Sequence, residues 1–166
     1  MDFELTEEQK AIQKLAREFA KREFPDLKAE LGEGEFPTKT WKMACELGLV
    51  GARIPSRHGG AGVDVQTSLL IEEEFFRINP RLAEAITFAT FGSDLIRMFG
   101  TEEQGEKYLR PLVEGKARMS SALEPEGGKP KELRLKARRE RGGWVIDGVV
   151  GIPAGPLPDF IIVLCT

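Results

Sequence analysis

The stretch that decides the fold is residues 96–125, IRMFGTEEQGEKYLRPLVEGKARMSSALEP, because a helical pattern ends within it and a strand pattern begins. Gly100 ends one helix, and Thr101, followed three residues later by Gln104, forms a capping box that opens the next. We expect that second helix to end near Leu112–Val113. The first half of the stretch is therefore helical.

The pattern changes after Gly115. Residues 117–123, ARMSSAL, form a short extended segment without helical periodicity. This change predicts an α+β chain with an N-terminal all-α helical domain of about five helices at residues 1–115. A few antiparallel strands of an incomplete β-domain are expected to follow at residues 116–166.

Capping and stop signals upstream of this stretch predict four further helices. Thr6 and Gln9 form a capping box for the first of them, and Pro25 ends it. The last of the four is apolar on most of its sides, which is typical of a central helix. The second, third and fourth helices are expected over residues 38–47, 64–78 and 81–99.

Strand patterns follow the stretch. Residues 132–140, ELRLKARRE, alternate between apolar and charged side chains, and WVIDG follows the turn pair Gly142-Gly143, so we expect a hairpin. Residues 159–166, DFIIVLCT, are typical of a buried strand. A small sheet with unpaired edges is a poor folding unit. We therefore expect a truncated domain whose edge is covered by further chain, by a homo-oligomer or by a partner subunit.

Composition and charge exclude several classes of protein. The 24 basic and 27 acidic residues nearly balance, which gives no support for a nucleic-acid partner. No apolar run approaches the roughly 20 residues of a membrane span. The acidic start MDFELTEEQK is not a signal peptide, and the two cysteines lie far apart, so we expect a cytoplasmic protein. His58 is the single histidine, and we expect no metal site.

Several motifs together resemble the acyl-CoA dehydrogenase family. They are the opening MDFELTEEQ, the FP…ELGL…GGxG pattern within residues 36–64, LLIEEEFFRIN at 69–79, the stretch at 96–125, and the later WVIDG and DFIIV. The resemblance covers essentially the whole chain in the right order. It implies a helical domain, a middle β-domain and a C-terminal helical domain, the last of which is absent here.

The resemblance implies α,β-dehydrogenation of an acyl-CoA thioester. In the family a glutamate removes the α-proton while FAD takes the β-hydrogen as hydride. Most members carry that glutamate in the C-terminal domain, so we assign no catalytic residue to this chain. The run Glu72, Glu73 and Glu74 is interpreted as a solvated helix face with one buried capping or ion-pair contact.

One flavin loop of the family has the pattern Leu-Thr-Glu-Pro-x-Ala-Gly-Ser-Asp. Glu124 and Pro125 match it, whereas leucine replaces the threonine in an ungapped alignment; a gapped alignment deletes the threonine instead. Lys129 replaces the serine and is either a point charge beside a phosphate or a solvated turn lysine. The cofactor-binding residues that the resemblance implies in this segment are Ser121, Leu123, Glu124, Gly127, Gly128 and Lys129.

A second flavin motif of the family is aromatic-Ile-Thr-Asn. Ile152 matches its isoleucine, and Pro153 replaces its threonine, so both flavin motifs have lost a hydroxyl. Two hypotheses follow: the N-terminal part of an FAD-dependent acyl-CoA dehydrogenase, or a non-catalytic binding or assembly module with weakened or lost FAD binding.

Three residues are candidates for substrate binding. The resemblance implies that the third and fourth helices line the acyl tunnel, which gives roles to Phe88, Phe91 and Leu95; core packing is the alternative. The glycine-rich loop Gly59–Gly62 lacks a nucleotide-binding context and resembles a structural turn near the substrate cleft. His58 beside it is interpreted as a packing or hydrogen-bonding residue.

Overall fold

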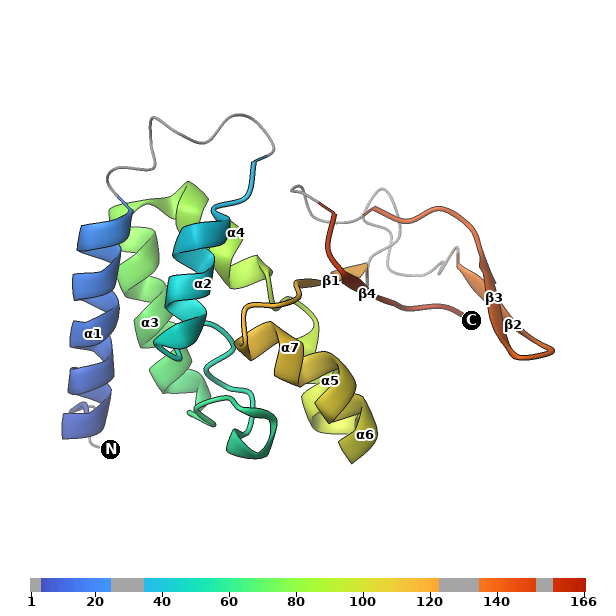
Figure 1. Cartoon of the computed structure of the whole chain (residues 1–166), viewed down its shortest axis with the longest axis horizontal. Helices are drawn as coiled ribbons and strands as arrows, with labels where there is room; N and C mark the ends of the chain where they lie inside the picture. The colour runs from blue at the N-terminus through green and yellow to red at the C-terminus, as the bar shows by residue number, and fades with distance from the viewer. Residues whose placement is uncertain (1–3, 25–34, 123–134, 152–156) are drawn as a thin grey trace.

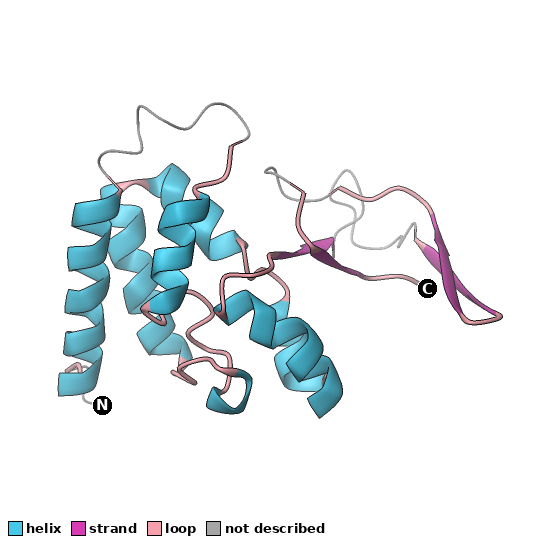
Figure 2. Cartoon of the chain, viewed as in Figure 1, coloured by secondary structure: helices cyan, strands magenta, loops and turns pink. Residues whose placement is uncertain are grey.

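The α+β class that the sequence predicts is confirmed by a computed structural model, which describes residues 4–24, 35–122, 135–151 and 157–166. The helices gather at one end of the molecule and the strands at the other (Figures 1 and 2). The helices are α1 (Glu7–Glu23), α2 (Thr38–Glu46), η2 (Ser56–His58), α3 (Val65–Ile78), α4 (Pro80–Phe88), α5 (Ser93–Phe99), α6 (Glu102–Gln104), η3 (Gly105–Leu109) and α7 (Arg110–Val113). The strands are β1 (Met119–Ala122), β2 (Lys136–Glu140), β3 (Gly143–Asp147) and β4 (Phe160–Val163).

The predicted capping residues begin their helices. Thr6 accepts a hydrogen bond from the Gln9 amide at 3.2 Å, and the Gln9 side chain accepts one from the Thr6 amide at 3.0 Å. Thr101 forms the same capping box with Gln104 at the start of α6. Asp64 accepts from the amide of the third residue of α3 at 2.7 Å. These bonds satisfy amides that a helix start leaves without partners.

The helix expected over residues 81–99 differs from the prediction, because it is broken into α4 and α5. The chain turns between them at Gly92, whose φ of +99° is a conformation that favours glycine. The Ala89 carbonyl leaves the helical ladder and accepts a hydrogen bond from the Met119 amide at the start of β1. Since α5 has no fully buried residue, only α4 fits the expected central position.

The predicted fifth helix is continuous but contains a wider π-helical turn, η3, between α6 and α7. The turn begins at Gly105, where a Cβ atom would overlap the imidazole of His58. Glycine at this position lets the buried histidine pack directly against the helix backbone.

Two buried clusters make up the described core. In the first, α1, α2, α3 and α4 meet around three aromatic rings, Phe19, Phe24 and Phe75, whose centroids lie 5.1 to 6.0 Å apart. The second lies between η3, α7 and β1 and includes Leu112 and Met119. Both clusters belong to the helices and to β1, so the later strands contribute little to the buried core.

The strands form two separate pairs. β2 and β3 form the predicted antiparallel hairpin, with Glu140 opposite Gly143 beside the turn. β1 and β4 pair in parallel, with Met119 opposite Phe160, which differs from the expected antiparallel arrangement. β4 was expected to be buried, but its residues are half-buried or exposed. Among the described helices, none has the length and apolar character that crossing a membrane requires.

Candidate functional site

A cavity of about 470 Å³ lies between α3, α4, α5, the loop at residues 49–54 and the end of β1. Its volume is in the range of small-molecule sites. The cavity has both apolar and polar walls, and its position joins the helical part to the first strand. The residues that line it include Arg53, Ile71, Glu72, Phe75, Asp94 and Ser121.

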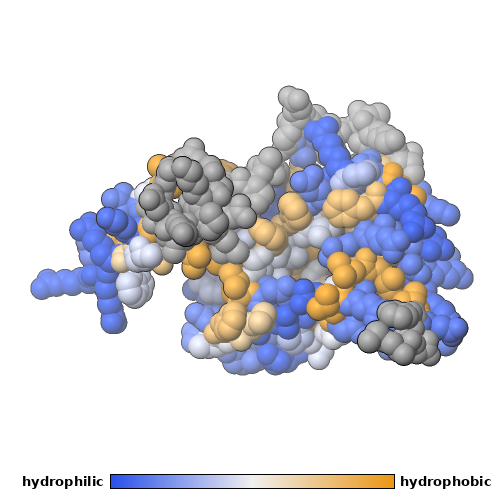
Figure 3. Space-filling model, turned by 180° about the vertical axis from the view of Figure 1, so that it is seen from behind, coloured by the Kyte–Doolittle hydropathy of each residue, from blue (hydrophilic) through white to orange (hydrophobic). Residues whose placement is uncertain are grey.

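The three predicted substrate-binding residues all line this cavity. Phe88 and Phe91 are 39% and 43% exposed, and their ring centroids lie 5.4 Å apart. Leu95 follows on the first turn of α5. Because these side chains are only partly buried, they form a wall of the cavity rather than part of the packed core. Figure 3 shows hydrophobic areas on the face of the molecule opposite to that of Figure 1.

Ser121 is the predicted cofactor residue that the structure describes, and it also lines the cavity. Its side chain is buried, at 3% exposed, and its hydroxyl has no hydrogen-bond partner in the described part of the chain. A buried hydroxyl without a partner is uncommon and calls for an explanation. The remaining predicted cofactor residues, Leu123, Glu124, Gly127, Gly128, Lys129, Ile152 and Pro153, lie outside the described residues.

Gly92 brings α5 close to this hydroxyl. A Cβ atom on Gly92 would lie 3.0 Å from the Ser121 Cβ and 3.4 Å from Ile162 Cδ1. The break between α4 and α5 therefore lets the cavity wall lie directly against β1 and β4.

The glutamate run on α3 is arranged largely as interpreted. Glu74 is fully buried and forms a bidentate ion pair with Arg17, whose Nη2 and Nε donate to the two carboxylate oxygens at 2.8 and 3.0 Å. These hydrogen bonds lower the pKa of Glu74. Glu73 is exposed and pairs with Arg77. Glu72 differs, because it is half-buried in the cavity wall and burial raises its pKa.

The position of Glu72 was not predicted, although a signal was present. Ser68, Ile71, Glu72 and Phe75 line the cavity from successive turns of α3, with the i, i+3, i+4, i+7 spacing of one helix face. Interpreting the three glutamates together hid the fact that one of them shares a face with apolar residues.

A second ionic group lies in the same wall. Asp94 accepts from Arg53 Nη1 at 2.7 Å through one carboxylate oxygen and from Arg97 Nε at 2.8 Å through the other. The Asp94 carboxylate is therefore fully engaged by the two guanidinium groups.

The glycine-rich loop is a tight turn that packs against Ile54 in the loop that precedes η2. A Cβ atom on Gly60 would overlap the backbone carbonyl of Ile54, and Gly59 and Gly62 have φ values of +87° and +67°. The Gly62 amide donates to that same Ile54 carbonyl at 3.0 Å. These contacts explain why the turn requires glycine at these positions, without a role in binding.

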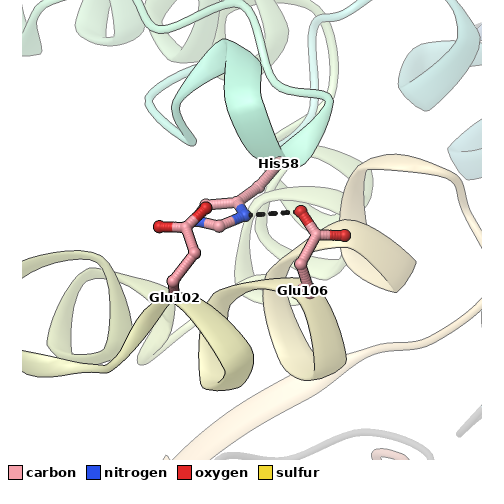
Figure 4. A group of neighbouring side chains, drawn as sticks. All are labelled: His58, Glu102 and Glu106. Atoms are coloured by element: carbon pink, nitrogen blue, oxygen red, sulfur yellow. Dashed lines mark hydrogen bonds and ion pairs between the residues drawn. The ribbon is translucent and has the colours of Figure 1, made fainter.

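His58, Glu102 and Glu106 form a cluster whose potential ligand atoms lie within 4.8 Å of one another (Figure 4). His58 is buried, and its Nδ1–H donates to Glu106 Oε1 at 3.0 Å. Arg110 holds the same carboxylate at 2.6 Å, and Arg57 pairs with Glu102 at 3.1 Å. Since arginines neutralise both carboxylates, the arrangement is that of an ion-pair network that ties η2 to α6 and η3.

The electrostatic effect of this network is concentrated on one group. Hydrogen bonds from Arg110 and then from His58 lower the pKa of Glu106 to about 2. The carboxylate therefore stays ionised across the physiological range and keeps its two partners in place.

Comparisons with known proteins agree with the motifs. The sequence model of the family described as acyl-CoA dehydrogenase, N-terminal domain, matches residues 6–116 of this chain. A probable acyl-CoA dehydrogenase of Bacillus subtilis is 36% identical over 152 residues, which cover 89% of this chain and 40% of the relative. A 3-(aryl)acrylate reductase of Clostridium sporogenes is 32% identical, over 95% of this chain and 43% of the relative.

A solved structure is also similar over nearly the whole chain. An acyl-CoA dehydrogenase complexed with FAD from Bacillus anthracis is 31% identical, with a TM-score of 0.84 over 98% of this chain and 29% of the other. The chain spans about two fifths of the length of the two curated relatives. The family resemblance inferred from the motifs is confirmed.

Proposed function

Because the chain belongs to the acyl-CoA dehydrogenase family, we propose that it supplies the N-terminal helical domain and first strands of an FAD-dependent enzyme that dehydrogenates acyl-CoA thioesters. The main observation in support of this proposal is the cavity of about 470 Å³ between the helices and β1. It is a concave, largely apolar site with a few polar groups, as expected for a site that binds a small molecule.

In this proposal the apolar wall of the cavity holds the acyl chain. Phe88, Phe91 and Leu95 lie on that wall and remain accessible to a ligand. Burying an alkyl chain against them is favourable by about 0.8 kcal/mol for each CH₂ group removed from water. This gain depends on chain length, so the size of the cavity sets the length that is accepted.

The end of β1 is proposed to lie beside the flavin. The buried Ser121 hydroxyl, which has no partner among the described residues, fits a polar ligand that approaches β1 from the cavity. A hydroxyl can both donate and accept a hydrogen bond, as can the polar edge of a flavin. FAD, when bound, would accept the hydrogen from the substrate. The residues of this chain would bind and orient the flavin and the substrate.

The proposal places the proton-abstracting glutamate outside these residues and assigns no catalytic residue within them. It also includes an oligomer or a partner subunit. The outer edges of β3 and β4 have no strand partner in the part of the chain that the structure describes. Open edges of this kind favour pairing with further chain.

A second candidate function is a non-catalytic module with weakened FAD binding. The observation that favours it is the loss of a hydroxyl in each of the two flavin motifs, at Leu123 and Pro153. One lost neutral hydrogen bond costs only about 0.5–1.5 kcal/mol, so the two losses weaken binding without abolishing it in themselves.

The visible absorption spectrum of the purified protein, with and without added FAD, distinguishes the two functions. The proposed function predicts stoichiometric flavin whose absorption bands shift when butanoyl-CoA is added. Ser121→Ala, which removes the buried hydroxyl and adds no volume, is expected to weaken flavin retention, whereas Ser56→Ala on the exposed surface of η2 serves as the matched control. A protein that takes up no FAD even in excess contradicts the proposed function for this chain and supports the second candidate.

A further inference from the structure

The cavity has a polar wall that an unsubstituted acyl chain does not require. Ile71, Phe75 and Phe91 are sufficient to contact an alkyl chain, yet Glu72 and Asp94 also line the cavity. Placing a carboxylate in a partly buried, apolar wall is unfavourable unless it finds a donor. The two carboxylates differ in whether they have one.

Asp94 is already satisfied. One of its oxygens accepts from Arg53 at 2.7 Å and the other from Arg97 at 2.8 Å. Each guanidinium donates an N–H group to Asp94, and Arg53, which lines the cavity, is already paired there with a carboxylate of opposite charge.

Glu72 is not satisfied within the part of the chain that the structure describes. It has no hydrogen bond or ion pair there, and Arg53 acts on it only by charge at a distance. Its neighbours on α3 are both paired, Glu73 with Arg77 and Glu74 with Arg17. Burial raises the pKa of Glu72, which shows that its surroundings disfavour the ionised form.

As far as the described residues go, a second polar side chain that lines the cavity also lacks a hydrogen-bond partner. The hydroxyl of Ser121 is buried and has no hydrogen bond among the described residues. Glu72 on α3 and Ser121 on β1 therefore line one cavity, and neither side chain has a hydrogen-bond partner within the described part of the chain. A ligand with polar substituents suits both groups, because the buried hydroxyl normally requires a partner and the half-buried carboxylate gains a charge-assisted hydrogen bond.

We propose that the cavity selects acyl groups that carry a hydrogen-bond donor, a hydroxyl or an ammonium group, which the Glu72 carboxylate accepts. This inference rests on the proposed function, in which the cavity holds the acyl part of an acyl-CoA. It makes Glu72 a specificity-determining residue. An acyl group with a free carboxylate is disfavoured beside Glu72, because the two negative charges repel each other and Arg53, which lines the cavity, already pairs with Asp94.

The test measures the affinity of the purified protein for matched pairs of CoA thioesters by calorimetry. Each pair has equal numbers of heavy atoms: an unbranched acyl chain, and the chain one carbon shorter with a terminal hydroxyl or amine, in lengths of about four to seven carbons. We expect at least one hydroxyl- or amino-acyl thioester to bind about tenfold or more tightly than its alkyl counterpart.

Variants separate the role of the carboxylate from that of its charge. Glu72→Leu is expected to reverse the preference in favour of the alkyl chain. Glu72→Gln is expected to keep part of a preference for hydroxyl and to lose a preference for ammonium, which tells the two donors apart. Glu73→Gln, on the exposed side of α3, is the matched control and is expected to leave every affinity unchanged.

Three outcomes overturn the inference. If every alkyl thioester binds as tightly as its donor-bearing counterpart, Glu72 does not select the acyl group. If Glu72→Leu, shown by its melting temperature to be folded, keeps the wild-type order of affinities, another residue does so. If no thioester binds at all, the assignment of the cavity fails together with the inference, which distinguishes that failure from the other two.

Discussion

The helical part of the molecule and the β2–β3 hairpin differ in what stabilises them. The helices bury three phenylalanine rings in one cluster, and their starts are capped by side chains such as Thr6 and Asp64. The hairpin, in contrast, exposes Trp144 by 66% and buries none of the side chains of β2 or β3. Its link to the rest of the described chain includes hydrogen bonds between Thr166 and the backbone of Leu135 and Ala137.

This difference shows where folding information is local and where it is not. A capped amphipathic helix specifies its own ends, whereas an isolated two-stranded hairpin is marginal in water. The helical part is therefore expected to fold by itself, and the hairpin to depend on chain or partner that covers it.

The largest effect is expected from Phe75→Ala. Phe75 is 1% exposed and lies 5.1 Å from the Phe24 ring and 5.8 Å from the Phe19 ring. The cavity left behind is expected to lower the free energy of unfolding by about 3–5 kcal/mol, measured by urea unfolding followed by far-UV circular dichroism.

The matched control is Trp144→Ala in the hairpin. This larger side chain is mostly exposed, so its removal is expected to change the free energy of unfolding by no more than about 0.5 kcal/mol. A tryptophan deletion as costly as that of Phe75 would show that the hairpin belongs to the same cooperative unit, and the contrast between the two regions would be wrong.

A glycine pair tests the same contrast at the level of the backbone. In Gly60→Ala the new Cβ meets the Ile54 carbonyl, which is backbone and cannot rotate away. We expect a loss of about 1–3 kcal/mol in the free energy of unfolding. Gly143→Ala in β3 meets nothing within 4 Å and is expected to be nearly neutral. Equal melting temperatures of the two variants would contradict the close packing of the glycine-rich loop.

Local signals in the sequence predicted the helix starts, and non-local contacts limited the rest. Thr6 and Thr101 were recognised because each capping box lies within four residues. The break at Gly92 was missed because it depends on β1, more than twenty residues later, which binds the Ala89 carbonyl. The parallel pairing of β1 with β4 was missed for the same reason.

The predictions for the cavity residues also succeeded where the sequence signal was sufficient and failed where non-local contacts decide. Phe88, Phe91 and Leu95 were proposed from the family motifs, and the structure brings them into one cavity. Glu72 was assigned with its neighbours to a solvated face, because the three glutamates were interpreted as one group. The helical spacing that places Glu72 on the same face as Ile71 and Phe75 was overlooked. The hydroxyl of Ser121 became informative only when the structure showed that it is buried and has no hydrogen-bond partner among the residues described.

A smaller effect is expected from Thr6→Ala at the start of α1. The substitution removes the side-chain acceptor of the Gln9 amide and is expected to cost about 1 kcal/mol of unfolding free energy. Thr6→Ser keeps the hydroxyl and serves as the control, with an expected loss close to zero. If the alanine and serine variants melt at the same temperature, capping does not contribute to the stability of the helical part.

The smallest effect at neutral pH, and the most specific in its pH dependence, is expected from Glu106→Gln. The pKa of Glu106 in the folded protein is about 2, below its ordinary value of 4.5, because Arg110 and then His58 donate hydrogen bonds to it. Its ionised form therefore stabilises the fold above pH 4.5, and this contribution is lost as the pH falls toward 2. The difference in stability between wild type and Glu106→Gln is expected to shrink across that window. Glu140→Gln on the hairpin, measured by the same unfolding titrations, is the control; if its difference from wild type shrinks equally, the effect belongs to the net charge rather than to the network around His58.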